Sequence, residues 1–196
     1  MYTPSPFAFD DADAIADFIA EHPFAELISN GRQEPLVSHI PIARVPDGAI
    51  CGHLAAGNPQ ADIADGTPVV AVFRGPHAYV SPSDFASEFN VPTWNYAAVH
   101  CHGEIRFIGD GELAWQRIGE LVEIQEGSGG WQLPDETRFR ALLPAVRVFE
   151  IDAPRFEGKA KFSQNKSPED ADSVIENLEA RGEGAAAAFM KKTRKA

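Results

Sequence analysis

Cysteine is scarce in this chain of 196 residues: only Cys51 and Cys101 are present, and they do not form a CxxC pattern. This scarcity argues against a disulfide framework and a cysteine-based zinc site, so we expect two buried free thiols. No apolar run is long enough to cross a bilayer, and the acidic start "MYTPSPFAFDDADAIADF" lacks the features of a signal peptide. We therefore expect a cytoplasmic protein with no membrane association.

Basic residues are also scarce, with 17 lysines and arginines against 29 acidic residues and a net charge of -12. Binding to duplex DNA normally requires a basic face that displaces phosphate counterions. The only basic run is "KKTRKA" at residues 191–196, which can be a solvated helix end or a nucleic-acid tail. The composition favours the helix end, so we do not expect the isolated protein to bind DNA directly.

The sequence lacks the GxGxxG and GxxxxGK[ST] loops that cradle phosphates, and it lacks the GxSxG elbow of serine hydrolases. Any nucleotide-like ligand must therefore be held in another way. Ser38 next to His39 is not a hydrolase signal, because neighbouring residues of a strand face opposite sides.

The apolar pattern predicts mostly strands. Residues 24–55 alternate apolar and polar residues around Asn30-Gly31 and Asp47-Gly48, which is typical of a three-stranded meander. Strands are also expected at 67–82, 91–107 and 145–163, and helices at 10–23, at 111–126, from 134 and from 167. We predict a mainly β antiparallel barrel of about six strands as a single domain over residues 1–196, with a helical insertion at 111–144 and a C-terminal helical extension at 167–196.

The predicted strand at 91–107 has two unlike faces. Reading every second residue from Asn95 gives a small, apolar set that suits a core. The alternate set carries aromatic, imidazole and charged side chains: Trp94, Tyr96, His100, His102, Glu104 and Arg106. If the first set fills the barrel, this second face must be covered by something else, and Trp and Tyr are favoured at interfaces.

Polar residues cluster in four motifs, and each cluster can have a purely structural role instead of a functional one. The histidines at 39, 53, 100 and 102 do not complete a ligand set with a carboxylate or cysteine, so no metal is expected. Trp94 and Tyr96 fit either packing or ligand stacking. Lys159, Lys161 and Ser163 are spaced two residues apart, so a continuous strand would place them on one face. The two lysines suit either a solvated edge strand or the binding of a phosphate group.

The motifs resemble those of a known family. "MYTPSPF", "SHIP", "GHLAAGNPQ", "GPHAYVSP", "VPTWNYAAVHCHG" and "EGKAKFSQNK" occur in the order and spacing of the PaiB-like proteins, which are FMN-binding negative transcriptional regulators. The resemblance covers residue 1 to about residue 166. It implies a split barrel that forms a homodimer, with FMN held in clefts between the subunits.

On the combined reading, the expected cofactor-binding residues are Ser38, His39, His53, Asn58, Trp94, Tyr96, Lys159, Lys161, Ser163, Gln164 and Asn165. Three functions remain open: a dimeric FMN-binding transcriptional regulator, an FMN-dependent oxidoreductase or flavin reductase, and a cofactor-free interaction module. The sequence assigns no catalytic residue, because a flavin brings its own redox chemistry.

Overall fold

The computed structural model describes residues 1–194, which form two compact units. The barrel unit comprises residues 16–73 and 100–156, and the terminal unit comprises residues 1–15, 74–99 and 157–194. Three long strands contribute residues to both units. The sequence prediction of a single domain over the whole chain stays a prediction.

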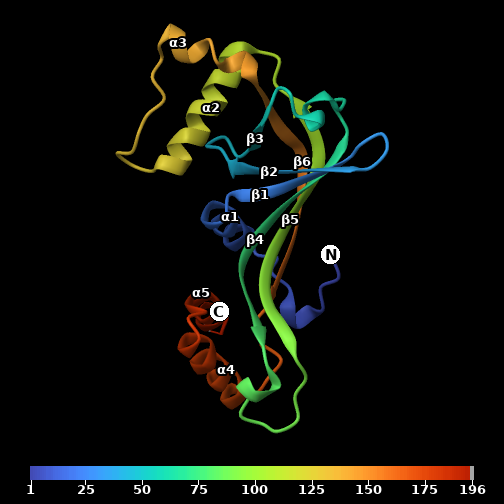
Figure 1. Cartoon of the computed structure of the whole chain (residues 1–196), viewed down its shortest axis with the longest axis vertical. Helices are drawn as coiled ribbons and strands as arrows, with labels where there is room; N and C mark the ends of the chain where they lie inside the picture. Colours follow the sequence, from blue (N-terminus) through green and yellow to red (C-terminus); the bar gives the residue numbers. More distant parts are fainter. Residues whose placement is uncertain (195–196) are drawn as a thin grey trace. The chain divides into compact units, whose positions relative to one another are not determined.

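Six strands form a closed barrel in the order β1-β2-β3-β6-β5-β4 (Figure 1). The prediction of a mainly β, six-stranded antiparallel barrel is confirmed. The strands are β1 (Phe24–Asn30), β2 (Pro35–Arg44), β3 (Ile50–Ala55), β4 (Pro68–Val80), β5 (Thr93–Phe107) and β6 (Val146–Lys161).

The first three strands form the meander that the turn residues predicted. In β1 and β2, Asn30 is opposite Pro35, and β2 pairs antiparallel with β3 through Arg44 and Ile50. The second turn uses Gly48 at φ +92°, a conformation that glycine adopts without steric cost. Asp47 supports this turn by accepting a hydrogen bond from the amide of Ala49 at 3.0 Å.

Strand β5 has the two faces that its sequence indicates. The side chains of Asn95, Val99, Cys101 and Ile105 are fully buried, as predicted for the core-facing set. On the alternate set, Trp94, Glu104 and Arg106 are exposed, and Tyr96, His100 and His102 are half-buried. Both cysteines are free, and burial raises the pKa of each thiol to about 12.

The helices begin where capping side chains are available. In the barrel unit, the Asp110 carboxylate caps α2 (Gly111–Glu126) by accepting hydrogen bonds from the amides of Glu112 and Leu113. This helix packs against β2 and β3 (Figure 1), and its Ala114 and Leu121 join a buried cluster with barrel residues. The remaining helices are α1 (Ala12–Glu21), α3 (Thr137–Arg140), α4 (Pro168–Ala180) and α5 (Gly184–Thr193).

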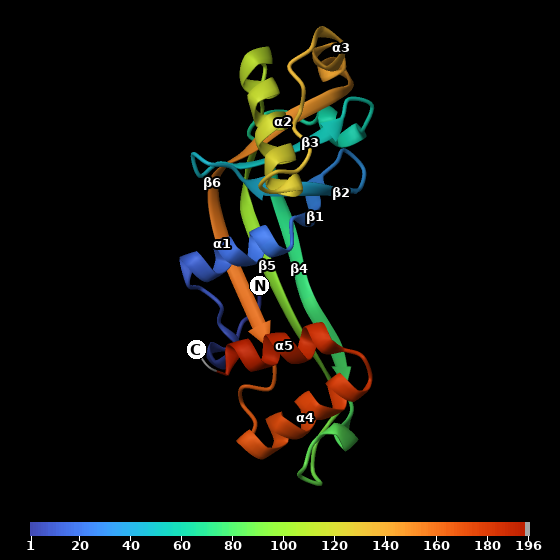
Figure 2. The same cartoon turned by 90° about the vertical axis from the view of Figure 1, so that its left-hand side faces the viewer.

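Two helices of the terminal unit, α4 and α5, pack side by side (Figure 2). The Ser167 hydroxyl caps α4, and Gly182 at φ +82° lies in the turn between the two helices. Part of the basic run, Lys195 and Ala196, lies outside the described residues. Among residues 1–194, no helix has both the length and the apolar character required to cross a membrane.

Candidate functional site

A groove of about 510 Å³ lies on the barrel unit beside two residues that the sequence singled out. Asn58 caps the short 3-10 turn Pro59–Asp62 through a 2.9 Å hydrogen bond from the amide of Gln60. The side-chain amide of Asn58 also donates to Ser38 Oγ at 2.9 Å. The structure therefore brings Ser38 and Asn58 together in the groove wall.

Gln60 fastens this turn to the barrel. Its side chain is fully buried, and Nε2 donates to the carbonyl of Leu27 at 3.1 Å and to Ser29 Oγ at 2.9 Å. The sequence reading quoted Gln60 in "GHLAAGNPQ" without assigning it a role. Its contacts show why a polar residue follows Asn-Pro, since an amide can bind several strand oxygens at once.

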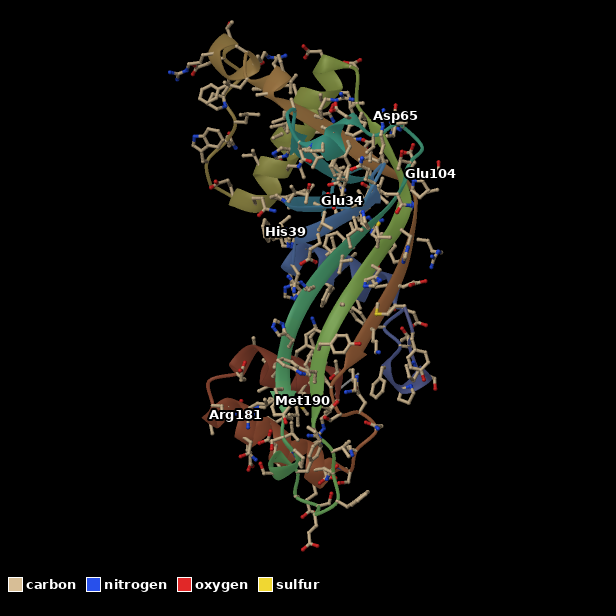
Figure 3. All side chains as sticks on the ribbon, turned by 45° about the vertical axis from the view of Figure 1, so that its right-hand side comes forward. Glu34, His39, Asp65, Glu104, Arg181 and Met190 are labelled. Carbon is tan, nitrogen blue, oxygen red and sulfur yellow. The ribbon has the colours of Figure 1, made fainter. Side chains whose placement is uncertain are left out.

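The two predicted histidines of the barrel unit have different surroundings. His39 is exposed on β2, with Nε2 3.8 Å from a carboxylate oxygen of Glu26 (Figure 3). His53 lies on β3, and its buried Nδ1 has no hydrogen-bond partner among residues 1–194. Burial lowers the pKa of His53, so this imidazole is neutral at pH 7. A neutral ring nitrogen can donate or accept one hydrogen bond, so Nδ1 can pair with a polar group that reaches it.

In the terminal unit, the partners of Lys159 and Lys161 among residues 1–194 are neutral oxygens and aromatic rings. The ammonium group of Lys159 donates to the Tyr2 carbonyl at 3.0 Å and lies 5.3 Å from the centre of the Tyr96 ring. Lys161 donates to Thr93 Oγ1 and to the carbonyl of Trp94. Within residues 1–194, neither lysine pairs with a carboxylate.

The pKa of Lys161 is lowered by burial first, and then by the positive charges of Lys159 and Lys166. Three cations thus act on one another in a chain that is strongly acidic overall. An anionic ligand would relieve this repulsion, because opposite charge favours the protonated form.

The expectation that Ser163 shares a strand face with the two lysines is wrong. Strand β6 ends at Lys161, and Ser163 adopts φ +63°, so the alternation of faces stops before it. Its buried hydroxyl instead accepts a 3.2 Å hydrogen bond from Asn95.

The neighbouring amides also behave differently from each other. Gln164 folds back on its own strand, accepting from the amide of Phe162 and donating to the carbonyl of Ala160, both at 2.6 Å. Its side chain is therefore occupied by the strand end. Asn165 is exposed and forms no hydrogen bond with the other residues up to 194.

An exposed group of rings completes the terminal unit's part of the candidate site. Trp94 is 54% exposed and Tyr79 is 47% exposed, and their ring centres lie 5.9 Å apart in an edge-to-face arrangement. His77 lies 6.2 Å from the same indole. Sequence reasoning assigned no site role to His77 or Tyr79, although both belong to the motif "GPHAYVSP" that it quoted.

These residues fit the chemical parts of FMN. The phosphate requires cations, which Lys159 and Lys161 supply, and the flat ring requires aromatic or apolar surface, which Trp94 and Tyr96 supply. The barrel unit offers a groove with Ser38 and Asn58 in its wall. It also offers the buried Nδ1 of His53, which has no hydrogen-bond partner among residues 1–194.

Comparison with known proteins shows that the chain belongs to an FMN-binding family. The family model described as "Putative FMN-binding domain" matches residues 1–155. The chain is 32% identical over 186 residues to "Protease synthase and sporulation protein PAI 2" of Bacillus subtilis, covering 91% of this chain and 89% of that protein. The PaiB-like resemblance and the FMN cofactor expected from the sequence are both confirmed.

One more distant relative is similar in sequence, and two solved structures are similar in fold. An uncharacterised protein of Emericella nidulans, AN0679, is 27% identical over 91% of this chain and 90% of that protein. The FAD and heme binding protein of Mycobacterium smegmatis has a TM-score of 0.64 at 19% identity, covering 86% of this chain and 78% of that one. The flavocytochrome Anf3 of Azotobacter vinelandii also has a TM-score of 0.64, at 16% identity, covering 79% and 69%.

The family match ends before the motif "EGKAKFSQNK" of residues 157–166. The assignment of Lys159 and Lys161 to a cofactor site therefore depends on their contacts rather than on that match.

Proposed function

We propose that this protein is a cytoplasmic FMN-binding homodimer that acts as a negative transcriptional regulator of the PaiB type. Family membership supports the flavin, and the name of the Bacillus subtilis relative refers to protease synthesis and sporulation. The observation that carries the proposal is the pair of lysines with neutral partners on a unit that also exposes Trp94 and Tyr79.

In this proposal the phosphate of FMN binds Lys161 and Lys159, and the ring stacks on Trp94 and Tyr96. Bound FMN would supply one- or two-electron redox chemistry, and the protein supplies placement and charge. Ser38, His39, His53 and Asn58 of the barrel unit and Ser163, Gln164 and Asn165 of the terminal unit stay predictions as cofactor-binding residues. A visible absorption spectrum of freshly purified protein tests the binding, since oxidised flavin absorbs where the polypeptide does not.

The homodimer is proposed because a monomer would leave Trp94 and Tyr79 largely in water. Exposed aromatic side chains beside a strand are typical of association surfaces. Light scattering should give twice the chain mass at micromolar concentration. A monomer mass there would contradict the dimer and leave FMN binding untouched.

We propose that the regulator acts without contacting DNA by itself. With a net charge of -12, the protein should show no tight, salt-sensitive binding to duplex DNA near physiological ionic strength. Fluorescence anisotropy with a labelled duplex measures this. A tight complex that weakens steeply with added salt would show that this protein contacts DNA itself and would contradict the proposal.

A second candidate is an FMN-dependent oxidoreductase or flavin reductase acting on a small molecule. It is favoured by His53, whose neutral imidazole can exchange a proton at pH 7. His53 and the groove residue Ala55 lie two positions apart on β3. Sustained oxidation of a reduced nicotinamide by the FMN-loaded protein, abolished in His53→Gln, would establish this activity over regulation alone.

A further inference from the structure

Residues 1–9, here called the N-terminal arm, lie against the end of β6, wholly within the terminal unit. Ala8 forms an antiparallel bridge with Lys159, and the amide of Phe9 donates to the carbonyl of Gly158 at 3.3 Å. Phe7, in the 3-10 turn Ser5–Phe7, is buried. The arm is therefore held on the strand that carries both lysines of the proposed phosphate site.

Gly158 is the residue of β6 that admits the arm. A Cβ atom at this position would lie 1.9 Å from the carbonyl oxygen of Phe9, and real Cβ contacts essentially never fall below 3.0 Å. A glycine inside a strand often marks a place where another backbone approaches closely. A side chain at position 158 would thus push the arm away from the strand.

Tyr2, at the far end of the arm, covers the ammonium group of Lys159. Its carbonyl oxygen accepts the 3.0 Å hydrogen bond from Nζ, and the centre of its ring lies 5.8 Å from Nζ. The Tyr96 ring, at 5.3 Å, is the third contact of this group among residues 1–194. An ammonium group has three N–H donors, so the arm supplies two of the three contacts that satisfy it.

These contacts leave Lys159 9% exposed, whereas the Tyr2 residue itself is 85% exposed. Tyr2 therefore shields the lysine from water without being packed into a core. A phosphate that is to bind Lys159 must take the place of the Tyr2 contacts.

We propose that the N-terminal arm competes with FMN: it covers Lys159 in the unliganded protein, and the FMN phosphate displaces Tyr2 from the ammonium group. This inference rests on the phosphate site proposed above. The phosphate of FMN carries about two negative charges near neutral pH, and a charge-assisted hydrogen bond is stronger than one to a neutral carbonyl. The apparent FMN affinity is then reduced by the fraction of molecules in which the lysine is uncovered.

Amide hydrogen exchange at Phe9, followed by NMR, tests whether FMN releases the arm. This amide donates to Gly158 only while the arm is docked, so its protection reports docking. Saturating FMN should speed its exchange by about tenfold, because FMN weakens docking by the same factor by which docking weakens FMN binding.

Gly158→Ala tests the competition from the other side. Its methyl group undocks the arm, so FMN should bind about tenfold more tightly than to the parent in a fluorescence titration. Gly184→Ala is the matched control, because it adds the same methyl group to the terminal unit where a Cβ atom meets nothing within 4 Å. Its FMN affinity should equal that of the parent, and circular dichroism reports whether both variants are folded.

Tyr2→Ala decides the question even if Gly158→Ala does not fold, because Tyr2 is largely in water. It removes the ring contact with Lys159 and keeps the carbonyl. FMN binding should tighten by about two- to fivefold, which corresponds to one exposed cation–π contact.

Three results would overturn the proposal: unchanged or weaker FMN binding in Tyr2→Ala, equal FMN affinity in folded Gly158→Ala and the parent, or Phe9 exchange that FMN does not speed. The phosphate site is tested by another variant. If Lys161→Met weakens FMN binding and Gly158→Ala does not tighten it, the arm alone is excluded. If Lys161→Met binds FMN as the parent does, the proposed phosphate site itself is wrong.

Discussion

The buried cations of the two units differ in the charge of their hydrogen-bond partners. In the barrel unit, Arg117 is 6% exposed and donates to Glu150 at 2.7 Å, Glu120 at 2.8 Å and Asp47 at 2.5 Å. In the terminal unit, Lys159 is 9% exposed, and its partners among residues 1–194 are a carbonyl and aromatic rings. One cation is neutralised by the protein itself, and the other is not.

The difference separates a structural cation from a ligand-binding one. Burial alone would lower the pKa of Arg117, but its hydrogen bonds to Glu120, Asp47 and Glu150 outweigh burial and raise the pKa. Lys161 has no carboxylate partner within the described residues 1–194, and burial lowers its pKa. A cation whose charge is not neutralised inside the protein is the better candidate for an anionic ligand.

The largest expected effect comes from breaking the barrel network. Arg117→Met should lower the free energy of unfolding by about 3 kcal/mol, because it leaves the buried Glu150 carboxylate with fewer partners. Glu150 keeps its contact with Arg106, which places the loss near the lower end of the usual range. Urea unfolding followed by circular dichroism measures it.

Arg138→Met is the control for this prediction. Arg138 forms an exposed ion pair with Glu136 at 2.8 Å, and such pairs contribute less than about 1 kcal/mol. Equal losses in the two variants would remove the distinction between a structural and a peripheral arginine.

The next effect should appear in binding rather than in stability. Lys161→Met keeps the aliphatic stem but removes the charge, so FMN affinity should fall by about tenfold or more. The fold should persist, because the lost hydrogen bonds go to neutral oxygens of Thr93 and Trp94. Fluorescence titration of FMN measures the affinity.

Lys192→Met provides the comparison, since Lys192 is an exposed lysine of α5. Its FMN affinity should equal that of the parent. If the FMN affinity of Lys161→Met also equalled that of the parent, the FMN phosphate would have to bind elsewhere. The different partners of the cations in the two units would then have no bearing on FMN binding.

The smallest effect is a pH dependence at His53. Burial lowers the folded-state pKa of His53 below its ordinary value of 6.5, so the folded protein takes up fewer protons than the unfolded chain. The stability should therefore fall as the pH drops through 6.5 and level off below the folded-state pKa. The loss should stay under about 1 kcal/mol, because the imidazole is only partly buried.

His53→Gln removes this titrating group. Between about pH 7.5 and about pH 5.5, the free energy of unfolding should fall more in the parent than in the variant. Thermal melts at several pH values decide it, and parallel curves for the two proteins would show that His53 titrates alike in the folded and unfolded states.

Local patterns identified the candidate site only in part. The hydrogen bond between Ser38 and Asn58 joins the motifs "SHIP" and "GHLAAGNPQ", which lie apart in the sequence. No local pattern predicts that these two residues are in contact. The contact of Lys159 with Tyr96 joins residues on two different strands. The positive φ of Ser163 reverses a prediction because strand alternation holds only while the strand continues.

The sequence by itself determined the barrel strands, the first turns and the core face of β5, because these depend on alternation and turn residues over a few neighbours. Its motifs also determined the family. The tertiary structure alone decided which cations are neutralised. Arg117 binds Asp47 and Glu150 from distant parts of the chain, whereas Lys161 binds a hydroxyl and a carbonyl among residues 1–194. Charge pairing depends on distance in space, which the order of residues along a chain does not state.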